Sequence, residues 1–271
     1  MKKILYIILS LFTASSALAN QPKDWQLGFQ DPASDGMRDI VNFHNNLLLP
    51  IIIAISVFVL FLMVYACIRF RASRNPNPSK TTHNVTVEIL WTLIPCLILI
   101  VMAVPSFKIL YTQDTIPKAD VTIKAVGYQW YWGYEYVDHD FGFDSVMLQK
   151  DELADYGYAP DEYLLATDTA VVVPVGATVV MQLTGADVIH SWTIPAFGVK
   201  QDAVPGRLAE LWFAAEKEGV YFGQCSELCG QAHAYMPITV KVVNKGQYDA
   251  WLSDAIEEFA GVPKSVQVAS N

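Results

Sequence analysis

The sequence predicts a two-helix transmembrane hairpin followed by a small all-β domain, a Greek-key barrel. Three apolar blocks lie before residue 112, short β-branched and aromatic runs follow it, and turn residues separate those runs. A chain that is 53% hydrophobic and 17% charged is too apolar for an ordinary soluble protein and too charged for one embedded wholly in membrane. We expect three parts, at residues 1–19, 20–111 and 112–271.

The first apolar block has the features of a secretory signal peptide. Lys2 and Lys3 precede an apolar run over residues 4–12, and small residues surround a cleavage position after Ala19. The alternative is a first membrane helix, but this run is too short to cross about 30 Å of hydrocarbon. We therefore expect residues 1–19 to be removed.

The other two apolar blocks, residues 47–68 and 89–107, contain no charged residue. At about 1.5 Å per residue even the shorter block reaches about 29 Å, enough to span a membrane. The loop between the two blocks contains four basic residues, Arg69, Arg71, Arg74 and Lys80. Basic residues in a short loop mark the cytoplasmic side, so both mature termini and everything after residue 112 are expected outside.

Glu88 stands at the cytoplasmic mouth of the second span, three residues before Trp91. A carboxylate there can cap the helix start, where the helix dipole favours negative charge. It can instead face a water-filled path, because ionisable groups at membrane depth are often functional. Spacing alone favours the capping role.

After residue 111 the pattern changes to short strands separated by Pro and Gly turns. The predicted strands are residues 121–127, 170–173, 178–183, 208–213, 220–223 and 238–243. Strands at this spacing predict an antiparallel sandwich or Greek-key barrel. Residues 141–168 are polar and irregular and are predicted as an inserted loop. Residues 247–259 have helical spacing and are predicted to close the chain as a helix.

The exported part is strongly acidic. From residue 112 onward there are 22 Asp and Glu against 9 Lys and Arg, a net charge of −13, whereas the whole chain carries −9. Such a surface repels nucleic acid and anionic head groups and attracts a basic protein partner. The alternative is that the acidity only keeps an exported domain soluble.

The residues from Cys225 to Met236 form a dense set of soft metal ligands. Two thiols, the imidazole of His233 and a thioether fall within this short segment, and a second histidine, His190, precedes it. Thiolate with imidazole suits zinc or copper, and a thioether indicates copper. A mononuclear blue-copper site needs one thiolate, but Cys229 supplies a second.

Two cysteines four residues apart can each bridge two metals, so that each metal takes one histidine. Met236 would then be a weak ligand to one copper, and the backbone carbonyl of Glu227 would serve the other. A disulfide between Cys225 and Cys229 and a Cys₂His₂ zinc site are two alternatives, and neither explains Met236. A third is that Met236 is only a core residue at the start of a strand. The five residues taken together favour binuclear copper. The sequence shows no nucleophile beside a base and no phosphate loop, so we expect no bond-making chemistry in this chain alone. It also has no Cys-x-x-Cys-His motif, which argues against a fused c-type haem.

The pattern Cys-Ser-Glu-Leu-Cys-Gly-x-x-His-x-x-Met over residues 225–236, with His-Ser-Trp at 190–192, resembles the copper A site of cytochrome c oxidase subunit II. Residues 129–136 resemble that family's aromatic cluster, residues 202–208 its loop beside the metal, and residues 88–95 its second helix. The similarity extends from about residue 25 to 260. The long 141–168 region suggests a bacterial version, and the resemblance is to the aa3-type.

The resemblance implies a cupredoxin-like domain with two copper ions that receives electrons from cytochrome c and passes them to haem in subunit I. Trp130 would be the point where electrons enter, unless it is only an aromatic belt residue. Glu227 would also bind magnesium or manganese at the subunit I interface. Glu88 would lie at the mouth of a proton channel, which favours a functional role over capping. Asp187 would join the acidic docking face.

The implied location is the bacterial inner membrane, with the copper domain and both mature termini in the periplasm. The implied partners are subunit I, further oxidase subunits, cytochrome c and the membrane, without nucleic acid. A membrane-tethered copper carrier and another copper A electron-transfer protein are the alternative functions.

Overall fold

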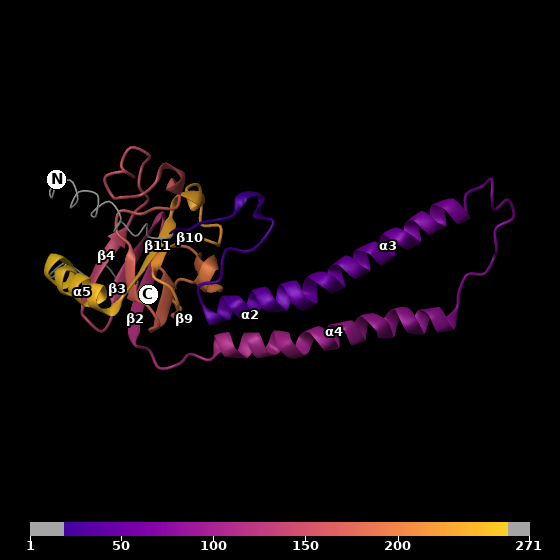
Figure 1. Cartoon of the computed structure of the whole chain (residues 1–271), viewed down its shortest axis with the longest axis horizontal. Coiled ribbons are helices and arrows are strands. Elements are labelled where there is room, and N and C mark those ends of the chain that lie inside the picture. Colours follow the sequence, from indigo (N-terminus) through magenta and orange to yellow (C-terminus); the bar gives the residue numbers. More distant parts are fainter. Residues whose placement is uncertain (1–18, 260–271) are drawn as a thin grey trace, which may run out of the picture. The chain divides into compact units, whose positions relative to one another are not determined.

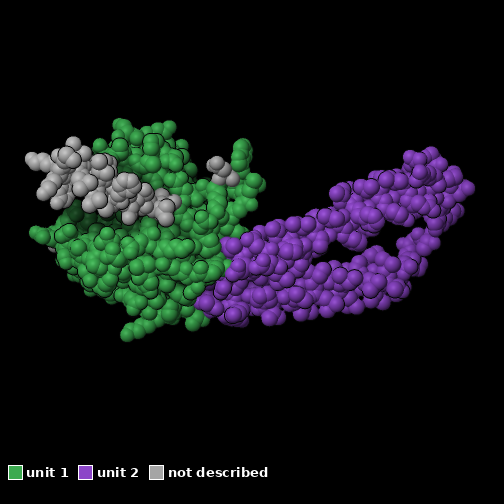
Figure 2. Space-filling model, in the orientation of Figure 1, with its two compact units in different colours: residues 1–38, 115–271 green, residues 39–114 purple. Residues whose placement is uncertain are grey.

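The computed structural model describes residues 19–259, which form two compact units. One unit comprises residues 39–114, and the other combines residues up to 38 with the chain from residue 115 onward (Figure 2). The first unit is helical, and the second contains all the strands of the described residues. The predicted signal peptide lies outside the described residues, except for Ala19.

The helical unit contains two long apolar helices, α3 (Leu49–Arg69) and α4 (Val85–Asp114), which run in opposite directions (Figure 1). The most apolar windows of the two candidate spans have mean hydropathies of 3.1 and 2.5, and no residue of these windows is buried. Both helices are therefore long and apolar enough to cross a membrane. The predicted spans at 47–68 and 89–107 fall within these helices and the turn before α3.

Local sequence explains where the two helices begin. Pro50 lies in the first turn of α3, and because it has no N–H it cannot donate the hydrogen bond that a continuous α-helix would make to the turn before it. A π-helical turn, His44–Leu48, joins α3 to the shorter α2 (Asp35–Phe43). α4 begins directly after Asn84, whose side-chain oxygen accepts a hydrogen bond from the Val87 amide at 3.2 Å. Asn84 is therefore the N-cap residue.

The β domain contains three sheets, with strand orders β4-β3-β2-β6-β9, β1-β10-β11-β5 and β7-β8. The strands are β1 (Ala19–Asn20), β2 (Val121–Tyr128), β3 (Tyr131–Tyr136), β4 (Phe141–Ser145), β5 (Val171–Pro174), β6 (Thr178–Gly185), β7 (His190–Ile194), β8 (Val199–Ala203), β9 (Ala209–Ala214), β10 (Gly219–Gln224) and β11 (Pro237–Val243). All six predicted strands are present, each within two residues of its predicted ends.

Two features of the sheets differ from the prediction. The sheets are mixed rather than purely antiparallel, because β2 pairs with β6 in parallel and β5 pairs with β11 in parallel. The segment 141–168 is not wholly irregular, because its first five residues form β4 against β3. Strands β1, β3, β7 and β8 were also not predicted; β8 is polar, with Lys200 and Asp202 in its middle.

A single hydrophobic core joins the two larger sheets. In β2 the alternate residues Val121, Ile123 and Ala125 are buried, and the same cluster contains Val240 of β11 and Trp192 of β7. Alternation of this kind turns one face of each sheet inward, as in a two-layer β domain. The small sheet β7-β8 therefore shares the core of the larger ones, which anchors the start of β7.

The rest of the inserted segment folds onto the domain. Residues 146–168 contain turns and one short 3₁₀ helix, yet Leu148, Leu153 and Tyr158 are buried in a second cluster with Phe222 of β10. At the end of the described chain, helix α5 (Lys245–Phe259) matches the predicted helix. Its Trp251 lies 5.2 Å from the ring of Tyr136, so α5 covers the edge of the core.

The segment before α2 is part of the β domain. The Ala33 amide donates to the Ala196 carbonyl at 2.9 Å, and the Glu216 amide donates to the Ala33 carbonyl at 2.9 Å. Ser34 Oγ donates to the Phe197 carbonyl at 2.7 Å, and Met37 is buried. Backbone bonding on both sides of Ala33 stabilises this segment as an extra layer of the domain.

Ile123→Ala tests whether the core joins the sheets as described. Ile123 is fully buried at the centre of β2, so we expect the free energy of unfolding to fall by about 2–5 kcal/mol. Thr122→Ala, on the opposite face of the same strand, should change it by less than about 0.5 kcal/mol. Denaturant unfolding of the full chain in detergent, followed by circular dichroism, measures both; equal losses would contradict this core.

Candidate metal centre

Two separate parts of the β domain supply the predicted metal ligands. His190 is the first residue of β7, and its side chain is fully buried. Cys225 and Cys229 lie in the loop that follows β10, and both are buried. His233 begins the short 3₁₀ helix η5 (His233–Tyr235), and the buried Met236 directly precedes β11. The fold therefore brings together all five side chains.

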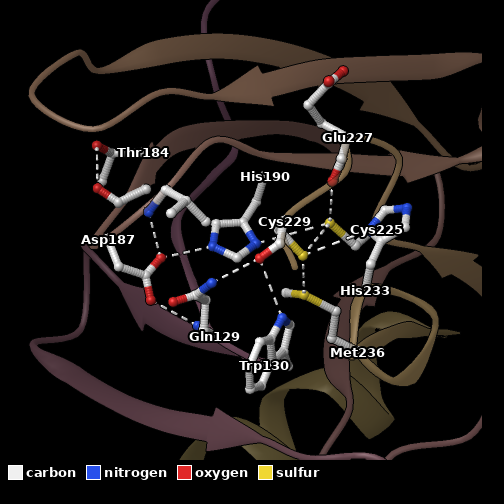
Figure 3. Close-up of polar contacts among 12 residues, drawn as sticks. Gln129, Trp130, Thr184, Asp187, His190, Cys225, Glu227, Cys229, His233 and Met236 are labelled. Atoms are coloured by element: carbon white, nitrogen blue, oxygen red, sulfur yellow. Dashed lines mark hydrogen bonds and ion pairs between the residues drawn. The ribbon is translucent and has the colours of Figure 1, made fainter. Parts of the chain in front are cut away.

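The donor atoms form a compact group around the two sulfurs (Figure 3). The Sγ atoms of Cys225 and Cys229 are 3.8 Å apart. Cys225 Sγ lies 3.8 Å from His190 Nδ1, and Cys229 Sγ lies 3.5 Å from His233 Nδ1. Met236 Sδ lies 3.5 Å from Cys229 Sγ. The two imidazoles approach the sulfur pair from opposite sides in Figure 3.

These separations fit metal coordination. Donors bound to one metal at about 2.0–2.3 Å with tetrahedral angles lie about 3.5–3.8 Å apart. A disulfide requires sulfurs about 2.05 Å apart, so the cysteines are present as free thiols. Two thiols, two imidazoles on opposite flanks and a thioether are also a softer donor set than a Cys₂His₂ zinc site needs. The donor set therefore suits copper.

The carbonyl of Glu227 completes this set. It lies 3.4 Å from Cys225 Sγ, whereas the carboxylate of Glu227 points away from the sulfurs (Figure 3). The loop is held in place by its neighbours, since the Ser226 amide donates to the Ser191 carbonyl at 2.9 Å. The Cys225 amide donates to the Met236 carbonyl at 3.4 Å, which closes the loop on itself.

The two thiols differ in protonation when no metal is bound. Burial raises the pKa of Cys225, but hydrogen bonds from His190 and from the Ser191 backbone outweigh burial and lower it to about 6. Burial and the neighbouring Cys225 charge together raise the pKa of Cys229 to about 12. Two sulfurs this close cannot both ionise unless a cation balances them, so a metal that binds here must displace the remaining thiol proton.

Asp187 fixes the orientation of His190. Its Oδ1 accepts a hydrogen bond from His190 Nε2 at 2.8 Å, which leaves Nδ1 directed at Cys225. Its oxygens also accept from the amides of Val188 and Gln129. Burial raises the pKa of Asp187, but the hydrogen bond from His190 and these amides outweigh burial and keep it below its usual value. A carboxylate behind a metal-binding imidazole selects its tautomer and direction.

Gln129 and Trp130 reach the metal loop through the Cys229 carbonyl. Gln129 Nε2 donates to this oxygen at 2.8 Å, and Trp130 Nε1 lies 3.3 Å from it. Trp130 is half-buried, so one part of its indole contacts the ligand loop and another part meets solvent. The predicted residue Trp130 therefore touches the backbone of a ligand residue directly.

Two family models match this chain. The model of the cytochrome c oxidase subunit II periplasmic domain matches residues 121–243, and the model of the corresponding transmembrane domain matches residues 22–109. The chain belongs to the cytochrome c oxidase subunit II family. A cytochrome c oxidase subunit 2 from Cereibacter sphaeroides is 51% identical over 267 residues, covering 90% of this chain and 88% of the relative.

Other members of the subunit II family are nearly as similar. A probable cytochrome c oxidase subunit 2 from Rickettsia bellii is 49% identical over 255 residues, covering 93% of each chain. The crystal structure of the periplasmic domain of subunit II from Bradyrhizobium japonicum is 50% identical, covers 54% of this chain and all of that one, and has a TM-score of 0.49.

Membership of the subunit II family confirms the predicted fold class and function. The chain is a membrane protein with two apolar helices and a cupredoxin-like periplasmic domain, and its His/Cys/Cys cluster is consistent with a copper A site. It belongs to a haem-copper oxidase complex as an electron-accepting subunit. The alternative of a tethered copper carrier is not favoured.

Glu88 lies in the first turn of α4, outside the β domain. Its carboxylate accepts a hydrogen bond from the Asn84 amide at 3.2 Å, while Asn84 in turn accepts from Val87. This reciprocal pair is the contact that the capping interpretation predicts. A small recess lined by Val85, Glu88, Ile89, Thr92 and Leu93 lies beside it.

Sequence reasoning missed the contacts that support the ligands. Asp187 was predicted as a docking residue, and its bond to His190 was not foreseen, although a carboxylate three residues before a histidine was the available signal. Gln129 stood inside the aromatic motif and was not singled out. Its contact with Cys229 joins residues 100 apart in sequence, which no local pattern reveals.

Proposed function

We propose that this chain receives electrons from a c-type cytochrome at a binuclear copper centre and passes them to haem in subunit I. The observation that carries the proposal is the sulfur pair of Cys225 and Cys229, 3.8 Å apart and flanked by one imidazole on each side. A single thiolate would suffice for one copper. The second thiolate lets each sulfur serve two metals.

The proposed ligands divide naturally between two ions. Cys225 and Cys229 would bridge them, His190 and His233 would each bind one, and Met236 and the Glu227 carbonyl would complete the set. When bound, a copper pair that shares two thiolates can take up one electron with little change in structure. The protein contributes rigidity, because His190 lies in a buried strand and backbone hydrogen bonds hold Cys225, His233 and Met236.

Metal analysis of the purified full chain tests this proposal. We expect two copper ions per chain, because one thiolate pair and two histidines provide ligands for two. The variant Cys225→Ser/Cys229→Ser should bind none, since serine is a poor ligand for copper. One copper per chain, or zinc in its place, would contradict the binuclear site.

We propose that Trp130 is the point where electrons enter. Its indole joins a partly solvent-accessible surface to the Cys229 carbonyl, which provides a short route into the ligand loop. The acidic surface of the domain would attract a basic cytochrome to this face, and the attraction would weaken as salt rises. The partly exposed Asp187 would contribute to that charge as well as orient His190.

Trp130→Gln should slow electron transfer from reduced cytochrome c by at least about tenfold while two coppers remain bound. Trp130→Phe keeps an aromatic ring and should retain more of the rate, and Tyr156→Gln, exposed on the 146–168 segment, should have no effect. Stopped-flow oxidation of the cytochrome measures the rate. Loss of copper in Trp130→Gln would instead make Trp130 a structural residue.

We propose that Glu88 both caps α4 and stands at the mouth of a proton path in subunit I. An ionisable side chain beside a small recess at a helix start suits both roles. Glu88→Gln keeps an oxygen that can accept from Asn84 but cannot ionise, whereas Glu88→Ala removes both properties. We expect both variants of the assembled oxidase to turn over more slowly with unchanged copper content. If only Glu88→Ala is slow, capping is the whole role.

The remaining assignments complete the proposal. The exposed carboxylate of Glu227 would bind magnesium or manganese where the loop meets subunit I, since carboxylate oxygen suits these hard cations.

Residues 1–19 would be a cleaved signal peptide, residues 20–111 the anchor and residues 112–271 the copper domain. The basic residues of the loop between α3 and α4 support a cytoplasmic loop, with both mature termini on the periplasmic side of a bacterial inner membrane.

A further inference from the structure

The inward-facing residues of the parallel strands β2 and β6 pair along one ladder. The pairs, taken along the strands, are Val121 with Val179, Ile123 with Met181, Ala125 with Leu183, and Gly127 with Gly185. All eight residues are buried. The last pair has no side chains, which leaves a bare patch of backbone on the inner face of the sheet.

The bare patch is filled by the end of the β7-β8 hairpin. A Cβ at Gly127 would lie 2.6 Å from His190 Cγ and 2.7 Å from His190 Cδ2. A Cβ at Gly185 would lie 2.5 Å from the Val188 carbonyl oxygen and 2.8 Å from that of Ala203. Ala203 is the partner of His190 in the hairpin. The paired glycines are therefore the surface against which the His190 ring and its hairpin rest.

The His190 ring meets a fixed group in each of its other directions. Trp132, the β3 residue that pairs with Gly127, is fully buried. Its ring lies edge-to-face with the imidazole of His190, with the ring centroids 5.9 Å apart. Asp187 holds Nε2, and Nδ1 is directed at Cys225. Because Gly127 packs against the ring as well, a displacement of the ring toward Trp132, Asp187 or Cys225 would disturb that neighbour.

A side chain at position 127 would therefore act first on the metal ligand. The backbone of Gly127 does not adopt a positive φ, so alanine meets no conformational strain there. In an open strand position, glycine to alanine would stabilise the fold slightly, because the unfolded chain loses freedom. Here the three nearest atoms are Cγ, Cδ2 and Cβ of His190, so the His190 ring and the start of β7 must shift instead.

We propose that Gly127 and Gly185 form a paired-glycine seat, and that Gly127 is a positioning residue that sets the direction of the His190 ring toward the copper-binding thiols. The inference rests on the proposed copper site. It adds a residue outside the ligand set. Because Gly127 has no side chain, the His190 ring can lie directly against β2.

Gly127→Ala in the full chain tests the seat. We expect its affinity for copper, measured by competition with a chelator, to fall by about tenfold or more, as for other changes beside a metal ligand. The hyperfine splitting of its electron paramagnetic resonance spectrum should change as well. The control is Gly133→Ala, whose Cβ would have the side chains of Tyr128 and Asp144 as its nearest neighbours, and it should leave both measurements unchanged. An unaltered spectrum and affinity in Gly127→Ala would overturn the proposal.

A second measurement tests the paired-glycine seat without copper. Its result can be interpreted even if Gly127→Ala folds poorly. The thermal unfolding of copper-free chains is compared for Gly127→Ala, His190→Gly and the double variant. If the clash is with His190, removing its side chain should reduce the temperature loss caused by Gly127→Ala by at least about half. An equal loss in both backgrounds would overturn the seat, whereas absence of copper from the unaltered chain would overturn the copper site alone.

Discussion

The sulfurs of Cys225 and Cys229 lie 3.8 Å apart inside the protein, close enough to repel each other once ionised and too far apart to be bonded. Burial makes this repulsion stronger than it would be in water. The thiol of Cys229 accordingly keeps its proton when no metal is present, with a pKa of about 12. A bound cation would allow both sulfurs to be thiolates at neutral pH, so the arrangement favours metal binding.

The β domain supplies this pair with ligands from two directions and holds each of them through other groups. Asp187 orients His190 from behind, and Gln129 and Trp130 hold the Cys229 carbonyl. Hydrogen bonds from Ser226 to Ser191 and from Cys225 to Met236 tie the ligand loop to β7 and to itself. A site held on every side changes little when an electron arrives, which is the requirement for rapid electron transfer.

The metal ligands could be predicted because they lie close together in sequence and their chemistry is distinctive. The spacing of Cys225, Cys229, His233 and Met236 alone indicated a soft-metal site. The helices could be predicted because an uncharged apolar run of about 20 residues matches the thickness of the hydrocarbon core of a membrane. These features depend only on local composition, which can be read directly from a single sequence.

The supporting contacts could not be predicted for the opposite reason. The bond between Gln129 and Cys229 and the contact between Gly127 and His190 join residues far apart in the chain. The parallel pairing of β2 with β6 depends on a crossover whose path no local signal defines. Strand β8 is polar in its middle, and its pairing with the buried strand β7 is stabilised by the core around Trp192.

The most direct test of the central claim, that both cysteines bridge one copper pair, is the electron paramagnetic resonance spectrum of the oxidised chain. If one unpaired electron is shared equally by two copper nuclei, the spectrum has a seven-line hyperfine pattern, and replacing either Cys225 or Cys229 with serine abolishes it. A four-line pattern from a single copper would contradict the account.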